Sequence, residues 1–168
     1  MTGELLTTMG KASERHKYIT DIVFVREMVA PCGMNCGTCL GYMRTANHCP
    51  GCRTDGDIKP PFCRECIISN CSHLRTTESK FCFECPRFPC RRLKDLDKRY
   101  RTRYNTSFFE NLTMVKEKGI DEFLEFETVR RTCPQCGSIL CIHRMTCLQC
   151  GYANPLLPGS FTDQNIER

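Results

Sequence analysis

The chain has 168 residues, enough for one ordinary domain or two small ones, and 16 of them are cysteines. Apart from the cysteines, apolar residues are sparse over residues 30–90, so this part cannot bury enough surface to fold without disulfides or metal ions as cross-links. The formal charge of +5 does not by itself indicate a nucleic-acid partner, because about fifteen thiolates on four zinc ions would bring the net charge to about −2.

Residues 1–27 contain no cysteine, and we expect them to form a separate extension that is disordered. Within it, Ile19 to Val25 fits a short strand, whereas the alternative is a mobile tail, and Met28 is a candidate start of the native chain. The segment lacks the long apolar run of a signal peptide, and no stretch approaches the roughly 20 apolar residues of a membrane span. We therefore expect a cytoplasmic protein without membrane contact, in which thiols stay reduced and dense cysteines bind metal.

Residues 28–92 form the predicted cysteine-rich metal-binding domain. Its eleven candidate ligands are Cys32, Cys36, Cys39, Cys49, Cys52, Cys63, Cys66, Cys71, Cys82, Cys85 and Cys90. The last six form a repeat, since Cys63-x₂-Cys66-x₄-Cys71 and Cys82-x₂-Cys85-x₄-Cys90 share one spacing at an offset of nineteen residues. Copies so short cannot be independent domains, and we expect them to face each other in one metal-held unit.

Eleven cysteines fill two four-ligand sites with three left over, or three sites that lack one ligand. A histidine would complete the third site, and the sequence places His48 before Cys49 and His73 just after Cys71. Alternatively, either histidine is an ordinary surface residue that binds no metal. The sequence does not decide which cysteines share a site.

Residues 93–131 form the predicted helical segment. Leu93, Leu96 and Tyr100 recur at helical spacing within a helix that follows Pro89. A second helix is predicted to begin near Asn105 or Ser107 and to end at a left-handed Gly119. A third begins at Asp121 and runs to about residue 131.

Residues 132–152 form a predicted zinc ribbon, and residues 153–168 form a tail. Two C-x-x-C-G turns supply Cys133, Cys136, Cys147 and Cys150, which is the pattern of a closed tetrahedral Cys₄ zinc site. Four thiolates leave no open position, so this zinc is expected to be structural. Between the turns, Cys141 is expected to pack inside the ribbon and His143 to make a surface hydrogen bond, with an extra metal site as the alternative.

The first cluster has an alternative to zinc. Cys32-x₃-Cys36-x₂-Cys39 has the spacing with which radical-SAM enzymes hold a [4Fe–4S] cluster, but the large barrel of those enzymes does not follow. An electron-carrying or sensing [4Fe–4S] centre with a remote fourth thiolate remains the alternative to zinc at one N-terminal site.

One family shares this ordered series of motifs. The motifs are Ala30-Pro31-Cys32-Gly33-Met34-Asn35-Cys36, Gly51-Cys52-Arg53, Phe62-Cys63-Arg64-Glu65-Cys66 and Cys85-Pro86-x-x-Pro89-Cys90. Together they resemble a cysteine-rich prokaryotic family named domain of unknown function 3795. Tyr100 to Tyr104 and the ribbon also resemble longer members of that family. The resemblance implies a zinc-binding fold and no established activity.

The sequence thus predicts a small metal-organised α+β protein, an irregular multi-metal domain with short helices and a C-terminal zinc ribbon. We expect about three or four zinc ions per chain, mainly structural, and an interaction module that binds another protein. Nucleic acid is the second choice of partner, through Arg91, Arg92, Arg99 and Arg101. Catalysis is not expected, because the only candidate pair for an activated thiol is Cys141 with His143.

Overall fold

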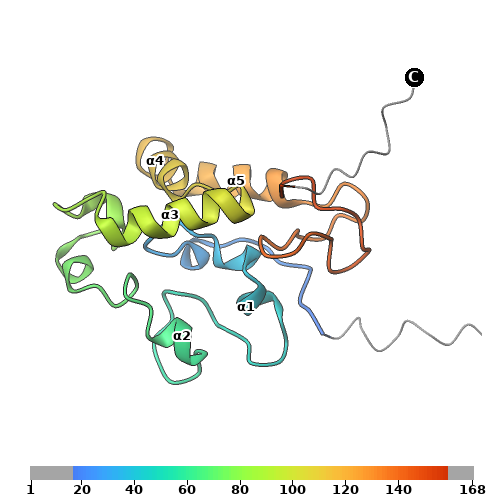
Figure 1. Ribbon diagram of the computed structural model, residues 1–168, viewed down its shortest axis with the longest axis horizontal. Helices are drawn as coiled ribbons and strands as arrows, with labels where there is room; N and C mark the ends of the chain where they lie inside the picture. The colour runs from blue at the N-terminus through green and yellow to red at the C-terminus, as the bar shows by residue number, and fades with distance from the viewer. Residues whose placement is uncertain (1–16, 159–168) are drawn as a thin grey trace, which may run out of the picture.

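The computed structural model of the protein describes residues 17–158. Three helices, α3 (Arg91–Tyr104), α4 (Phe108–Lys118) and α5 (Ile120–Arg131), form a layer along one side of the molecule. The cysteine-rich loops with the short helices α1 (Leu40–Met43) and α2 (Pro61–Arg64) lie on the other side (Figure 1). The C-terminal loops of the ribbon segment lie at the end of this layer, near the last turns of α3 and α5.

The three long helices follow the predicted pattern. Of the two predicted N-caps of α4, the structure has Ser107, whose hydroxyl accepts a hydrogen bond from the amide of Glu110. Asn105 instead ends α3 in the left-handed conformation, with φ 46° and ψ 44°. Gly119 joins α4 to α5 at φ +93°, which favours glycine, although its ψ of 162° is extended and not the predicted left-handed value.

The remaining elements are single turns. They are the 3₁₀ turns η1 (Arg26–Met28), η2 (Cys36–Thr38), η3 (Ser72–Thr76) and η4 (Cys82–Glu84), together with α1 and α2. Over residues 17–158 the extended backbone forms only isolated β-bridges, such as Thr132 with Ile139 and Thr146 with Ala153. The fold is therefore small and helix-rich, and the β part of the predicted α+β class is limited to these bridges. No helix within the described residues is long and apolar enough to cross a membrane.

Residues 17–27 pack against the body of the protein, and the predicted strand from Ile19 to Val25 does not form. The Ile19 amide donates to the carbonyl of Met43 at 2.6 Å, and the Thr20 carbonyl accepts from the amide of Ile139 at 3.1 Å. Phe24 is buried, and a Cβ placed on Gly37 would lie 2.8 Å from its ring. Residues 17–27 are thus held by contacts with the body of the protein, while residues 1–16 lie outside the described part.

The first cysteine turn is fixed directly on the helical layer. Gly33 has φ +87°, and a Cβ at this position would lie 2.9 Å from Cγ of Leu112 and 3.0 Å from the carbonyl oxygen of Phe108. Its own carbonyl accepts a hydrogen bond of 2.8 Å from the Asn111 side chain. Only glycine combines this backbone conformation with so close an approach, so α4 positions Cys32 and Cys36 on either side.

Asp97 holds the corner between α3 and α4. Its side chain is buried, and Oδ1 accepts hydrogen bonds from the Ser107 hydroxyl at 2.9 Å and from the amides of Phe108 at 2.7 Å and Phe109 at 3.2 Å. A carboxylate at a helix N-terminus also interacts favourably with the helix dipole.

Replacing Asp97 by alanine should therefore destabilise the fold by about 3 kcal/mol, because charge-assisted hydrogen bonds disappear and buried donors are left without an acceptor. The matched control is Asp95→Ala, which removes only an exposed pair with Arg91 at 3.7 Å and should cost less than about 0.5 kcal/mol. Denaturant unfolding of both variants measures the difference, and equal losses would contradict the assigned role of Asp97.

Candidate metal centres

The ribbon segment brings its four predicted ligands together. The Sγ atoms of Cys133 and Cys150 are 3.7 Å apart, and those of Cys136 and Cys147 are also 3.7 Å apart. Tetrahedral zinc with Zn–S bonds of about 2.3 Å requires neighbouring sulfurs about 3.8 Å apart. In the described part of the chain this is the one group of three or more potential ligands whose donor atoms all lie within 4.8 Å of one another. This donor set fits one tetrahedral metal ion.

Each C-x-x-C-G turn has the same local geometry. The amide of Gly137 donates to the carbonyl of Cys133, and the amide of Gly151 donates to that of Cys147, both at 2.9 Å. The two glycines have φ of +77° and +78°, a left-handed conformation that side chains disfavour. This left-handed backbone explains why a glycine follows the second cysteine in both turns.

The ribbon is attached to the rest of the protein by its central segment. The amide of Leu140 donates to the carbonyl of Arg131 at 2.7 Å, and that of Ile142 donates to the carbonyl of Thr38 at 2.8 Å. Cys141 is fully buried, but it packs with the main core, whereas Cys133, Leu140 and Cys147 form a separate apolar cluster. Cys141 is thus buried as predicted, but it packs against the main core and not inside the ribbon.

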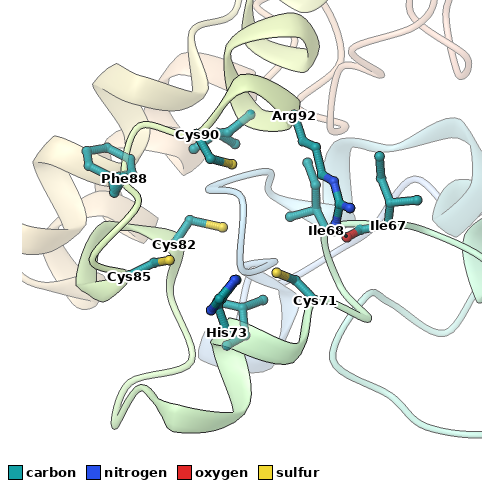
Figure 2. A pocket seen from close by; sticks show the side chains of 11 residues that line it. Ile67, Ile68, Cys71, His73, Cys82, Cys85, Phe88, Cys90 and Arg92 are labelled. Atoms are coloured by element: carbon teal, nitrogen blue, oxygen red, sulfur yellow. Dashed lines mark hydrogen bonds between the residues drawn. The ribbon is translucent and has the colours of Figure 1, made fainter.

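A second group of thiols surrounds a small apolar cavity of about 30 Å³ next to the start of α3. Figure 2 shows the sulfur atoms of Cys71, Cys82, Cys85 and Cys90 turned toward the space between them, with the His73 ring beside them. Burial and then the neighbouring thiols of Cys90, Cys71 and Cys85 raise the pKa of Cys82 to about 12. These four thiols face one cavity, but no three of their sulfur atoms all lie within 4.8 Å of one another, as those of the ribbon cluster do.

This grouping divides the sequence repeat in an unexpected way. The third cysteine of the first copy, Cys71, joins all three cysteines of the second copy, while Cys63 and Cys66 face a different cavity. The expectation that the two copies form one unit holds only for Cys71. The local structures differ as well, since Cys63 lies in the α-helical turn α2 and Cys82 begins the 3₁₀ turn η4.

The other seven N-terminal cysteines line one large cavity of about 540 Å³ between the loops and α3. They are Cys32, Cys36, Cys39, Cys49, Cys52, Cys63 and Cys66. All sixteen cysteines are free thiols, so disulfides do not cross-link the described fold. The three cysteines of the first cluster share this cavity, although they have different immediate partners.

Contacts inside the cavity link particular thiols to one another. The amide of Cys52 donates to Sγ of Cys36 at 3.3 Å. Burial raises the pKa of Cys32 well above its usual value, and the thiols of Cys52, Cys82 and Cys66 raise it further. Burial and then the adjacent, hydrogen-bonded thiol of Cys49 raise the pKa of Cys63 to about 12, and Cys39 also contributes. We assign Cys32, Cys36, Cys52 and Cys66 to a first group and Cys39, Cys49 and Cys63 to a second, and Cys52 connects the two groups because its thiol also acts on the pKa of Cys39 and of Cys63.

Arg53 places a positive charge beside the first group. Its guanidinium donates to the carbonyl of Val29 at 2.6 Å and lies 4.4 Å from the centre of the Phe81 ring. Burial lowers the pKa of Arg53, whereas the thiols of Cys36, Cys32 and Cys52 raise it. The motif Gly51-Cys52-Arg53 contains this residue, but the sequence alone gave it no role beside the thiols.

His143 and Tyr100 close the side of the cavity that faces the ribbon. Nδ1 of His143 accepts the Leu40 amide hydrogen at 3.3 Å, and Nε2 lies 3.0 Å from the Tyr100 hydroxyl. Burial, followed by Arg144 and Arg131, lowers the pKa of His143 to about 4, so the ring is neutral at physiological pH. The predicted hydrogen bond of His143 is present, but it lies at this cavity and not on the open surface.

Metal uptake should release protons. Burial raises the pKa of Cys63, Cys82 and Cys147 to about 12 in the metal-free fold, so these thiols are protonated at pH 7, whereas a metal ligand must be a thiolate. Affinity should therefore fall as the pH falls. Calorimetric zinc titrations of reduced protein in buffers of different ionisation enthalpy measure the release, and a heat that does not depend on the buffer would contradict it.

The family comparison covers the N-terminal metal-binding region. Residues 28–95 match the model of a family described as "Protein of unknown function (DUF3795)", which is the family that the sequence motifs resemble. The match ends within α3, so the likeness of the ribbon to longer family members stays a prediction. No curated protein matches the chain, and no solved structure matches it.

Proposed function

We propose that this chain, whose residues 28–95 match the DUF3795 family, is a zinc-binding protein in which the metal is mainly structural and which acts by binding another protein. The observation that carries the proposal is the placement of its thiols. Fifteen of the sixteen cysteines line the two N-terminal cavities or form the ribbon cluster, and only Cys141 lies elsewhere, in the core.

Zinc is the metal that the ribbon supports best. Its sulfur spacing of 3.7 Å fits a single tetrahedral ion, and four thiolates fill every coordination position, as in structural zinc sites. A metal so enclosed binds no substrate, which supports a structural role. The N-terminal thiols would add two or three further ions, in agreement with the expectation of three or four per chain.

Structural metal predicts that chelation unfolds the protein. Loops of residues 44–90 contain only single helical turns, and few of their apolar residues other than cysteines, such as Ile68, Leu74 and Phe81, are buried in the main core. Adding a strong zinc chelator without oxygen should expose these amides to hydrogen exchange, while readdition of zinc restores protection. Unchanged exchange after complete metal removal would contradict the structural role.

Two surfaces are candidates for the partner. Ile58, Phe62 and Ile67 are 69%, 68% and 59% exposed on the loop that supplies Cys63 and Cys66, and such exposed apolar side chains favour a protein partner. On α3 the four proposed nucleic-acid contacts, Arg91, Arg92, Arg99 and Arg101, are all exposed. Acidic neighbours dilute that charge, because Arg91 pairs with Asp95 and Arg101 with Asp97.

Affinity capture with matched variants tests the choice of partner. A protein partner is supported if the Phe62→Ser variant no longer captures a protein that the unchanged chain captures. The matched control is Val129→Ser on α5, which should still capture it, because Val129 is 81% exposed but lies away from the loop. Salt-dependent retention on RNA that disappears when the four arginines are replaced by glutamine would favour nucleic acid instead.

An iron–sulfur protein is the second candidate function. The observation that favours it is the cavity of about 540 Å³, which seven thiols share and which is larger than a single ion needs. Cys32, Cys36 and Cys39 all face it, so a [4Fe–4S] cluster for redox or sensing chemistry would have its predicted ligands there. Acid-labile sulfide and a brown colour in protein purified without oxygen would support this candidate.

A further inference from the structure

Seven thiols in the large cavity are one ligand short of two tetrahedral zinc sites. Cys71, Cys82, Cys85 and Cys90 make a four-thiol set around the neighbouring small cavity, and the ribbon has four of its own. Within the large cavity, Cys32, Cys36, Cys52 and Cys66 make another set of four. The group of Cys39, Cys49 and Cys63 therefore needs a fourth donor from elsewhere in the chain.

The geometry around α1 brings this three-thiol group together. A Cβ placed on Gly41 would lie 3.6 Å from Sγ of Cys39 and 3.6 Å from Cβ of Cys49. The amide of Cys49 donates to the carbonyl of Gly41 at 2.8 Å, and Cys63 hydrogen-bonds with Cys49. The fourth donor must therefore come from residues that surround the same turn.

Two of the three described histidines do not suit this group. His73 lies beside the small cavity, where four cysteines converge. His143 lines the large cavity, but its Nδ1 accepts from Leu40 and its Nε2 bonds to Tyr100, so neither nitrogen is free to bind a metal. The fourth histidine of the chain, His16, lies outside the described residues.

His48 differs from these in one respect. Its Nδ1 is buried and has no hydrogen-bond partner among the described residues, which costs free energy unless another group satisfies it. The ring packs 5.2 Å from that of Tyr42, a residue of α1 that lines the large cavity, and the next residue is Cys49. The unpaired nitrogen thus belongs to the residue before Cys49 and lies beside α1, whose N-cap is Cys39.

We propose that His48 completes a Cys₃His zinc site with Cys39, Cys49 and Cys63, separate from a Cys₄ site of Cys32, Cys36, Cys52 and Cys66 in the same cavity. Fifteen cysteines and one histidine then supply sixteen ligands, which four tetrahedral ions require. The charges also agree, because the Cys₄ site carries one more negative charge than the Cys₃His site and is the one beside Arg53.

This inference rests on the proposed function, and metal analysis of a variant set separates the two. In full-length protein purified without oxygen, His48→Phe keeps an aromatic ring against Tyr42 but removes the donor nitrogen. It should lower the zinc content by about one ion per chain, as should Cys63→Ser. The double variant of these residues should lose the same single ion, whereas His48→Phe with Cys66→Ser should lose about two. His73→Phe is the matched control and should retain all the zinc.

Cobalt substitution provides a second measurement. Replacing His48 by cysteine should restore the lost ion and shift the cobalt d–d absorption to longer wavelength, because a sulfur donor replaces nitrogen. If Cys63→Ser loses an ion while His48→Phe retains it, the role of His48 is wrong and the proposed function stands. If neither Cys63→Ser nor Cys66→Ser changes the metal content, or if the cavity holds iron and sulfide, the zinc sites themselves are wrong.

Discussion

Cys147→Ser is expected to unfold the ribbon and to remove about one metal ion per chain. The side chain of Cys147 is buried, and its Sγ lies 3.7 Å from that of Cys136 within the four-thiol cluster. Structural zinc contributes on the order of 10 kcal/mol of apparent folding free energy in zinc-finger peptides, which is comparable with the whole stability of a small domain. Loss of one ligand should therefore abolish the local fold.

Hydrogen exchange reports this local unfolding directly. The amides of Leu140 and Ile142 donate to Arg131 and Thr38, so they should lose protection in the Cys147→Ser variant. Cys141→Ala is the matched control, because Cys141 lies between the two turns and is buried but is not part of the cluster. It should keep its metal, and a Cys147→Ser protein with full metal content and protected amides would contradict the ribbon site.

Glu127→Ala is expected to destabilise the protein by about 3–5 kcal/mol, because it leaves the charge of Arg131 buried without its partner. The two side chains on α5 are only 2% and 1% exposed, with Oε2 of Glu127 3.6 Å from Nε of Arg131. Arg131 also donates to the Thr106 hydroxyl at 3.0 Å, and its carbonyl accepts from Leu140 of the ribbon. The pair therefore lies where α5 meets the ribbon segment.

Denaturant unfolding with two comparison variants tests this effect. Glu125→Ala, at an exposed position of α5, should change stability by less than about 0.5 kcal/mol. Replacing the pair together, as Glu127→Gln with Arg131→Met, should recover much of the loss, since neither charge remains buried. A double variant as unstable as Glu127→Ala alone would show that the loss has another origin, such as altered packing.

The long helices could be predicted because their information is local. Apolar residues at helical spacing, the cap at Ser107 and the glycine at position 119 determine α3, α4 and α5 almost to the residue. Local patterns failed where long-range contacts decide the conformation. The segment from Ile19 to Val25 has the composition of a strand. Its backbone makes single hydrogen bonds to Met43 and to Ile139, however, and these do not form a β-ladder.

The candidate site divides in the same way. The ribbon site could be predicted from local spacing, because each C-x-x-C-G turn directs two thiols to one centre without help from the rest of the chain. The N-terminal grouping depends on how loops far apart in the sequence meet, as when Cys52 contacts Cys36 or Cys71 joins Cys82. Tyr100 and His143 meet across 43 positions of sequence, which residue spacing does not encode.

Elemental analysis of the full chain, purified and measured without oxygen, decides whether the cysteine clusters hold zinc. We predict a colourless protein with three or four zinc ions per chain and no acid-labile sulfide. A brown protein that contains iron and sulfide, or reduced protein that is folded with less than about one zinc per chain, would contradict it.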